Sequence, residues 1–262
     1  MIRLWLCATA LWVLAAPVFA IDHDNVDGGR PLRFDDAEAI AFRERAIEFG
    51  LAAYSPYRRG GLGAAFSTEY LYGFAVNSHF SLDLDSSVGA RGGSGDKRFD
   101  VGNVGLGVFH NFNRETLTTP AYAVRADAYL PTGRGTRGVA LRLRGVMSRT
   151  FQQYNRVHVN VDANLQTSTR GGDRSFSPAV TVGFTRPLGY PTYFNRTGLA
   201  EIGVRASEES GRGAIFYGGV GIRQQVTVRS ALDLGARSDF AATNRNAARD
   251  NVTLVAGYST QF

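Results

Sequence analysis

Apolar and polar side chains alternate at every second position over long stretches of this chain. From Val157 to Leu165 the odd positions carry valine, alanine and leucine, whereas the even positions from His158 to Gln166 are all polar. Successive side chains of a β-strand point to opposite faces of the sheet. The stretch therefore predicts a strand with one apolar face and one polar face, and residues 124–130 and 139–144 show the same alternation.

Segments of this kind recur from residue 44 to the end of the chain, separated by polar breaks. They fall at residues 44–56, 62–75, 77–88, 100–112, 121–131, 138–150, 156–168, 176–187, 197–208, 214–225, 229–240 and 250–262. A tilted strand needs about 9–11 residues to cross a bilayer, and each segment is long enough. The pattern predicts an all-β fold, a transmembrane antiparallel β-barrel of about twelve strands over residues 44–262.

Alternation alone does not separate this fold from a soluble β-sandwich, in which the apolar faces point inward. Two further features favour the membrane barrel. The strands exceed the usual soluble length of about five or six residues. The connections also tend to alternate between longer loops rich in glycine and arginine and shorter turns, which is typical of outer-membrane barrels. A barrel of this kind is expected in the bacterial outer membrane, with lipid outside and a narrow polar lumen inside.

The last strand, residues 251–262, ends in the aromatic Phe262. An aromatic at the end of a membrane strand sits in the interfacial girdle, and the strand can pair with the first one to close the sheet. This arrangement resembles the terminal signal recognised by the barrel assembly machinery, which is therefore an expected partner. The alternative is the edge strand of a soluble sandwich.

The first 43 residues differ from the rest. Residues 1–20 have a basic start, an apolar run and small residues before Ala20, which predicts a cleaved signal peptide that removes Cys7, the only cysteine. Residues 21–43 are acidic and not strand-like, and we interpret them as a periplasmic leader that either hangs free or enters the barrel mouth. A calcium loop starting at Asp22 fails, because its fifth and twelfth positions are Val26 and Arg33.

Charge changes this picture little. The formal net charge is +6 and the isoelectric point about 9.7, but the excess comes from dispersed arginine without a basic block. Nucleic acid is therefore not an expected partner. The sequence also shows no metal-ligand spacing and no nucleotide-binding loop, so no cofactor is predicted.

Charged and polar residues on the inward faces are the candidates for contact with small solutes. They are Arg125, Asp127, Arg142, Arg144, His158, Asp162, Glu201, Arg205 and Arg223. The alternative is that they pair with one another and simply fill the lumen. In the predicted external loops, arginines could pair with lipopolysaccharide phosphates or remain solvated, namely Arg58, Arg59, Arg91, Arg98, Arg134, Arg137, Arg170 and Arg174.

Five short stretches carry a family resemblance. They are Gly29–Arg33 with Asp36-Ala37, Gly102–Val108, Tyr129–Gly133, Val157–Asn164 and Ala231–Arg237. Together they resemble a family of bacterial outer-membrane transporters labelled for the meta-pathway of phenol degradation. The resemblance implies a β-barrel that takes up aromatic or other hydrophobic compounds, and it carries over no binding residue.

His79 and Ser81 raise the possibility of an enzyme, because a His-x-Ser pair is similar to that of outer-membrane phospholipase A. Such a pair must face the lipid to reach a lipid substrate. Here Phe80, Leu82 and Leu84 occupy the apolar face, so His79 and Ser81 are expected in the lumen. The sequence therefore predicts a non-enzymatic channel for small solutes, and the resemblance implies aromatic or hydrophobic ones. The alternatives are a structural barrel with a plugged lumen and, less favoured, a lipid hydrolase.

Overall fold

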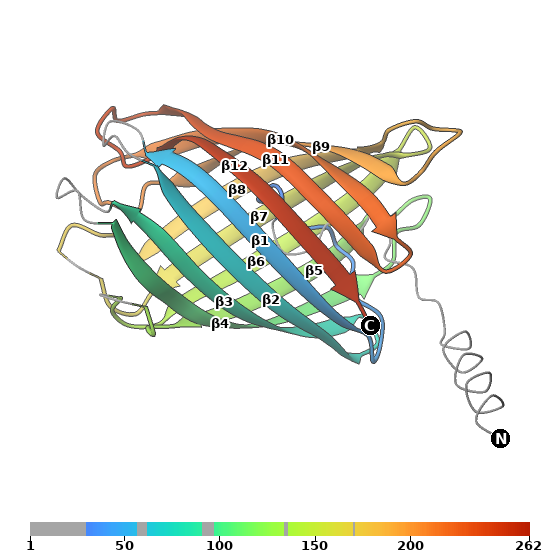
Figure 1. The fold of residues 1–262 in the computed structure, drawn as a ribbon, viewed down its shortest axis with the longest axis horizontal. Coiled ribbons are helices and arrows are strands. Elements are labelled where there is room, and N and C mark those ends of the chain that lie inside the picture. Colours follow the sequence, from blue (N-terminus) through green and yellow to red (C-terminus); the bar gives the residue numbers. More distant parts are fainter. Residues whose placement is uncertain (1–29, 57–61, 91–96, 134–135, 170) are drawn as a thin grey trace, which may run out of the picture.

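The computed structural model describes residues 30–56, 62–90, 97–133, 136–169 and 171–262. It contains twelve antiparallel strands closed into one barrel (Figure 1). The strands are β1 (Arg45–Pro56), β2 (Gly63–Ala75), β3 (Ser78–Ala90), β4 (Lys97–Asn113), β5 (Ala121–Leu130), β6 (Ala140–Phe151), β7 (Asn155–Gln166), β8 (Phe176–Pro187), β9 (Arg196–Ala206), β10 (Ala214–Thr227), β11 (Ser230–Ala242) and β12 (Asp250–Gln261).

The predicted strand number and fold class are confirmed, and most boundaries agree within two residues. Each strand pairs with its neighbours in sequence, and β1 pairs with β12 from Ala46↔Gln261 to Pro56↔Asp250. Closure leaves no open sheet edge, which satisfies the backbone of every strand. We call the end where β1 begins and β12 finishes the turn end, and the opposite end the loop end. In the described part of the chain, no helix has the length and apolar character of a membrane span.

The two faces of the barrel differ as the alternation predicts. Leu143 points outward and is 51% exposed, whereas its neighbour Arg144 points inward and is 5% exposed. Val161 and Asp162 show the same contrast, at 53% and 5%. The apolar face is therefore on the outside. A soluble sandwich would bury it instead, so that alternative is wrong.

Residues 30–43, which we call the inserted segment, enter the barrel (Figure 1). Residues 30–40 are buried or partly buried inside it, and residues 41–43 are exposed at the turn end. The chain turns inward just before β1, where Arg43 has a φ of 70° and donates from its backbone N–H to the Gly73 carbonyl at 2.6 Å. A Cβ at Gly73 would overlap the carbonyl oxygen of Ala41, so only glycine lets the segment pass here. Of the two placements left open for the predicted leader, the structure shows the barrel interior for residues 30–40. Residues 21–29 and the predicted signal peptide lie outside the described residues.

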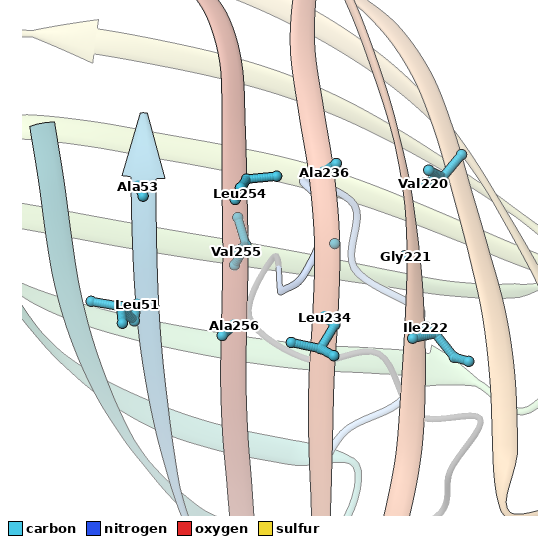
Figure 2. A pocket seen from close by; sticks show the side chains of 11 residues that line it. Leu51, Ala53, Val220, Gly221, Ile222, Leu234, Ala236, Leu254, Val255 and Ala256 are labelled. Carbon is cyan, nitrogen blue, oxygen red and sulfur yellow. The ribbon is translucent and has the colours of Figure 1, made fainter. Parts of the chain in front are cut away.

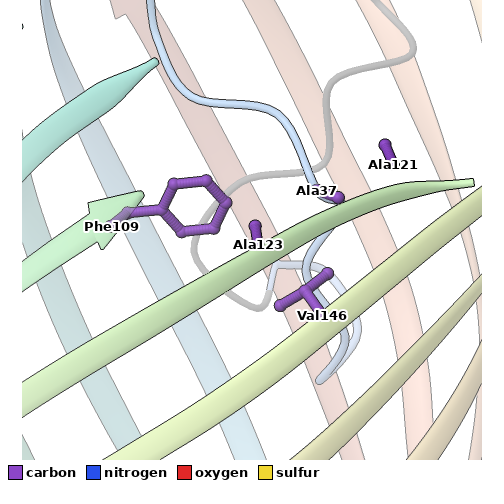
Figure 3. Packing of buried hydrophobic residues seen from close by; sticks show 5 residues of the cluster. All are labelled: Ala37, Phe109, Ala121, Ala123 and Val146. Atoms are coloured by element: carbon purple, nitrogen blue, oxygen red, sulfur yellow. The ribbon is translucent and has the colours of Figure 1, made fainter. Parts of the chain in front are cut away.

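Three small clusters of buried apolar residues line the interior, and each contains a residue of the inserted segment. Ala37 packs with Phe109, Ala121, Ala123 and Val146 of β4, β5 and β6 (Figure 3). The other two clusters are Leu32 and Phe34 with Leu199, and Ile40 with Ala46 and Leu71. Burying a large apolar side chain contributes about 1.5–3 kcal/mol, so these contacts hold the segment against the wall.

Candidate functional site: the barrel lumen

The nine predicted lumen residues all sit on the inward face. Seven of them are buried, and Arg142 and Arg205 remain partly exposed. The structure distributes these side chains over several separate charge networks around the wall, so they do not converge on one point. Their contacts show which of them pair only with the wall and which also hold the inserted segment.

The first network joins β2, β3, β5 and β6. Arg125 donates from Nη2 to Glu69 at 2.8 Å and from Nε to Asp127 at 2.8 Å. Asp127 also accepts from Arg142 Nε at 2.8 Å. The Asp127 side chain is fully covered, whereas that of Arg142 is 23% exposed. The solvent-facing partner in this network is therefore a guanidinium, with the carboxylate behind it.

The second network joins β6 and β7 to the inserted segment. Arg144 forms a two-pronged ion pair with Asp162, at 2.6 and 3.0 Å, and a further ion pair with Asp35 at 2.8 Å. Burial alone would raise the pKa of Asp35, but the surrounding guanidiniums, Arg144 foremost, hold that pKa below its ordinary value of 3.8. Asp35 is therefore a buried carboxylate that stays charged, and its charge stabilises its position beside Arg144.

The third network lies towards the loop end. Arg205 donates two hydrogen bonds of 2.8 Å to Asp239, and Arg33 of the inserted segment donates to the same carboxylate at 3.2 Å. The guanidiniums of Arg33 and Arg205 lie 4.4 and 5.7 Å from the ring centre of Tyr217. Glu201 accepts from the Arg33 backbone N–H at 2.5 Å. Both side chain and backbone of Arg33 are thereby fixed to the wall.

Arg223 and Asp233 form a further pair, buried within the wall at 2.7 and 3.0 Å. His158, by contrast, is hydrogen-bonded to Ser148 at 2.9 Å and to Thr185 at 3.2 Å, and its ring stacks on Phe34 with centroids 5.0 Å apart. Of the nine predicted residues, Arg144, His158 and Glu201 thus contact the inserted segment directly, while Arg205 does so through the shared Asp239.

The first part of the inserted segment lies in a shallow trough of glycines on β8, β10 and β11. A Cβ at Gly221 would lie 2.7 Å from Pro31, one at Gly219 would lie 2.9 Å from Leu32, and one at Gly183 would overlap the Phe34 ring. Glycine weakens a strand and often marks close approach by another part of the chain. We call Gly183, Gly219, Gly221 and Gly235 the glycine trough.

The second part of the segment is held mainly through its backbone. Asn160 accepts from the Asp35 N–H at 2.6 Å and donates to the Asp35 carbonyl at 2.9 Å. The Ala37 N–H donates to Ser148 at 2.9 Å, and the Ile40 N–H donates to His79 at 3.4 Å. These wall residues supply the hydrogen bonds that a buried non-regular backbone needs.

The sequence did not point to several charged residues that join the segment to the wall. On the wall these are Glu48, Glu69, Arg156 and Asp239, and on the segment they are Arg30, Arg33, Asp35 and Glu38. Strand alternation could have found the wall residues, since Glu48 lies between Ile47 and Phe49. The segment carries no such periodicity, so its inward placement had no comparable signal.

The outer wall carries a hollow of about 580 Å³ across β10, β11, β12 and β1 (Figure 2). Among its lining residues, Val220, Leu234 and Leu254 are more than half exposed, and Ala236 and Ala256 are small. These side chains are apolar and belong to the outward face of the wall. This is the surface that lipid chains are expected to cover.

His79 and Ser81 are buried and face inward, as the alternation predicts. His79 accepts from Ile40 and stacks on Phe109, while Ser81 accepts from Arg125 at 3.4 Å. Both side chains therefore have structural partners on the lumen side. Across the described ranges, no three metal-ligating side chains come together.

Three of the eight predicted external arginines lie among the described residues. Arg137 and Arg174 lie in loops at the loop end, where Arg137 is exposed, and Arg98 belongs to β4. The remaining five lie outside the described residues, namely Arg58, Arg59, Arg91, Arg134 and Arg170. Their pairing with lipopolysaccharide stays a prediction.

Comparison with solved structures finds chains of similar fold. An outer membrane channel from Pseudomonas putida F1 is similar with a TM-score of 0.67, at 13% identity, over 91% of this chain and 100% of that one. The translocator domain of the autotransporter NalP from Neisseria meningitidis is similar with a TM-score of 0.50, at 12% identity, over 85% of this chain and 89% of that one. At such identities the likeness shows the fold. No protein-family model and no curated protein matches the chain.

Proposed function

We propose that the protein is a channel of the bacterial outer membrane that passes small solutes and is closed in this conformation by the inserted segment. The observation that carries the proposal is that residues 30–40 lie across a polar lumen. The segment contacts opposite sides of the wall, from Glu48 on β1 to Asn160 on β7. The likeness to a solved outer membrane channel supports the fold that such a function needs.

The contacts of the segment suit a reversible closure. The segment is joined to the wall by ion pairs and hydrogen bonds, which water can replace when they break. The wall pairs Arg144–Asp162 and Arg205–Asp239 do not depend on the segment, so the lumen keeps paired charges after the segment moves. An opened lumen of twelve strands is expected to be narrow, because eight-stranded barrels are filled and barrels of about sixteen strands hold wide pores.

Placement in the membrane follows from the outward face. Its exposed valine, leucine and phenylalanine side chains would meet lipid, and Phe262, 57% exposed, would lie in the interface at the turn end. The Phe262 N–H donates to the Arg45 carbonyl at 3.0 Å, which keeps the terminal strand joined to β1. An aromatic residue directly after β12 would favour recognition of this strand by the barrel assembly machinery. The family resemblance adds aromatic compounds of the meta-pathway as the candidate cargo.

A second candidate is a structural barrel whose lumen stays permanently filled. The complete burial of Leu32 and Phe34 favours it, because removing both from the wall is costly. Conductance separates the two functions. A channel opens when the segment is loosened, whereas a permanently filled barrel does not.

The test is conductance of the full chain in planar bilayers, comparing the wild type with the double variant Arg30→Gln, Arg33→Gln. Loss of the contacts to Glu48, Glu69 and Asp239 should raise the open fraction by about tenfold or more, since ~1.4 kcal/mol already gives that factor. Arg212→Gln is the matched control, because Arg212 pairs with Glu209 in a loop. If wild type and double variant are equally silent, the channel proposal fails and the structural barrel remains.

A further inference from the structure

Three neighbouring strands give one side of the lumen an acidic surface. The described inward faces of β1, β2 and β3, which lie side by side (Figure 1), carry four carboxylates and no lysine or arginine. We call these residues the acidic row: Glu48 on β1, Glu69 on β2, and Asp83 and Asp85 on β3. Among the described side chains, the inward-facing arginines of the wall begin only at β5.

The strand register places three of these carboxylates next to one another. Glu48 lies opposite Glu69, and Glu69 lies opposite Asp83. Like charges directly opposite each other destabilise a sheet. At the same level the neighbours are Ser259 on β12 and Gly105 on β4, which carry no charge. A neutralising cation therefore has to come from elsewhere in the barrel or from the inserted segment.

The inserted segment supplies such a cation. Arg30 donates to Glu48 at 2.7 Å and to Glu69 at 3.3 Å, and its side chain is only 8% exposed. A Cβ at Gly50 would lie 2.9 Å from Cδ of Arg30, so glycine leaves room for this side chain on β1. The wall thus holds a place for a cation, and the segment fills it.

Without the segment, the acidic row is short of positive charge. Arg125 pairs with Glu69 and with Asp127, each at 2.8 Å. Its distance to Asp83 is 3.8 Å. Asp85 is exposed, and none of the described residues forms an ion pair with it. In contrast, four wall arginines keep a wall carboxylate within 2.8 Å, namely Arg142, Arg144, Arg205 and Arg223.

We infer that the acidic row makes the open channel selective for cations, and that Arg30 is the tethered cation that fills the row in the closed form. The inference rests on the proposed channel and adds the sign of charge that it favours. Carboxylates lining a pore select cations, because charge of one sign between low-dielectric walls concentrates counter-ions. Small inorganic cations and organic ammonium or guanidinium ions would therefore enter more readily than anions of the same size.

The test is the reversal potential of the full chain in planar bilayers under a gradient of KCl. Two open forms are compared, Arg30→Gln with Arg33→Gln, and Asn160→Leu, which loosens the segment and keeps both arginines. In both, K⁺ should permeate about fivefold more readily than Cl⁻, which corresponds to ~1 kcal/mol, the interaction of two unit charges 4 Å apart in water. Equal permeability, or a preference for Cl⁻, would overturn the inference.

Asp83→Asn with Asp85→Asn tests whether the row is the filter. Neither residue pairs with the inserted segment, so the change acts on selectivity and not on closure. Added to either open form, it should lower the permeability ratio to about one. Asp173→Asn with Glu209→Gln is the matched control, because it removes two carboxylates from loops at the loop end. If the control lowers the ratio as much, the row is not the filter.

Salt dependence gives a measurement that needs no change in the row. The Debye length is about 10 Å at 0.1 M and about 3 Å at 1 M, so selectivity due to fixed charge should fall as KCl rises. A cation preference that stays constant with salt would arise from pore size and would overturn the inference. Current without cation preference in the open forms leaves the channel standing and removes only the filter. Silence of every variant removes the channel and the filter together.

Discussion

Residues 30–34 and residues 35–41 of the inserted segment are held by the barrel in different ways. In the first half, Pro31, Leu32 and Phe34 fit by shape into the glycine trough. The ion pairs of Arg30 and Arg33 add to this hold. The second half is held mainly by hydrogen bonds from its backbone to Asn160, Ser148 and His79. The first half therefore depends on the volume of wall residues and on charge, and the second mainly on hydrogen bonds to polar wall residues.

The difference teaches how a wall of uniform strands can hold an irregular chain. A strand places its inward side chains at fixed spacing. At each inward position it can carry either glycine, which leaves space, or a polar side chain, which can form hydrogen bonds. Glycine supplies the empty position for a bulky residue. Asparagine, serine and histidine supply donors and acceptors for a backbone that has no regular partner.

The largest effect is expected from Asn160→Leu. This change leaves the N–H and the carbonyl of Asp35 buried without partners, at a cost on the order of 2–6 kcal/mol for two groups. The segment should leave the wall, and trypsin should then cut after Arg30 and Arg33. Resistance to trypsin equal to that of the wild type would show that Asn160 does not hold the segment.

Gly183→Val tests the half that is held by shape. The added side chain overlaps the Phe34 ring, and crowding of this kind costs roughly 1–3 kcal/mol. Amide exchange should rise at residues 32–34 and stay slow at Ala37 and Ile40. Adding Phe34→Ala should restore slow exchange. Simultaneous release of both halves would show that they form one cooperative unit, and the comparison would fail.

Asp35→Asn tests charge in the second half. The cost should be about 0.5–1.5 kcal/mol, because Arg144 keeps its two-pronged pair with Asp162. The pKa of Asp35 is lowered in the folded state, so its stabilising charge is fully present above the ordinary value of 3.8. The stability difference between wild type and variant, measured by thermal unfolding, should vanish as the pH falls through the lowered pKa. A difference that persists at the lowest pH would contradict this assignment.

The smallest effect is expected from Arg212→Gln. Arg212 and Glu209 form an exposed pair three residues apart in a loop, and such pairs contribute about 0.2–1 kcal/mol. Unfolding temperature should change little, and trypsin cleavage at Arg33 should not change at all. Faster cleavage there would mean that the loop end is coupled to the seat of the segment.

Much of the fold could be predicted from the alternation of residues such as Leu143 with Arg144 and Val161 with Asp162. The period of two is a local property of each strand, so it also placed Arg125, Asp127 and Arg223 on the inward face. Which carboxylate each arginine meets could not be predicted, because the partners come from other strands. Arg205 and Asp239, for example, are 34 residues apart.

The sequence by itself determined the number of strands, their bounds and the side that faces outward, because those features follow from a short repeating pattern. Only the tertiary structure decided that residues 30–40 lie in the lumen. Those residues have no period, and their acidic and arginine side chains look solvated until the wall supplies Arg144, Glu48 and Asp239 as partners. The role of the glycines of β8, β10 and β11 likewise depends on the tertiary structure. They make room for Pro31, Leu32 and Phe34 only once the barrel has closed around the segment.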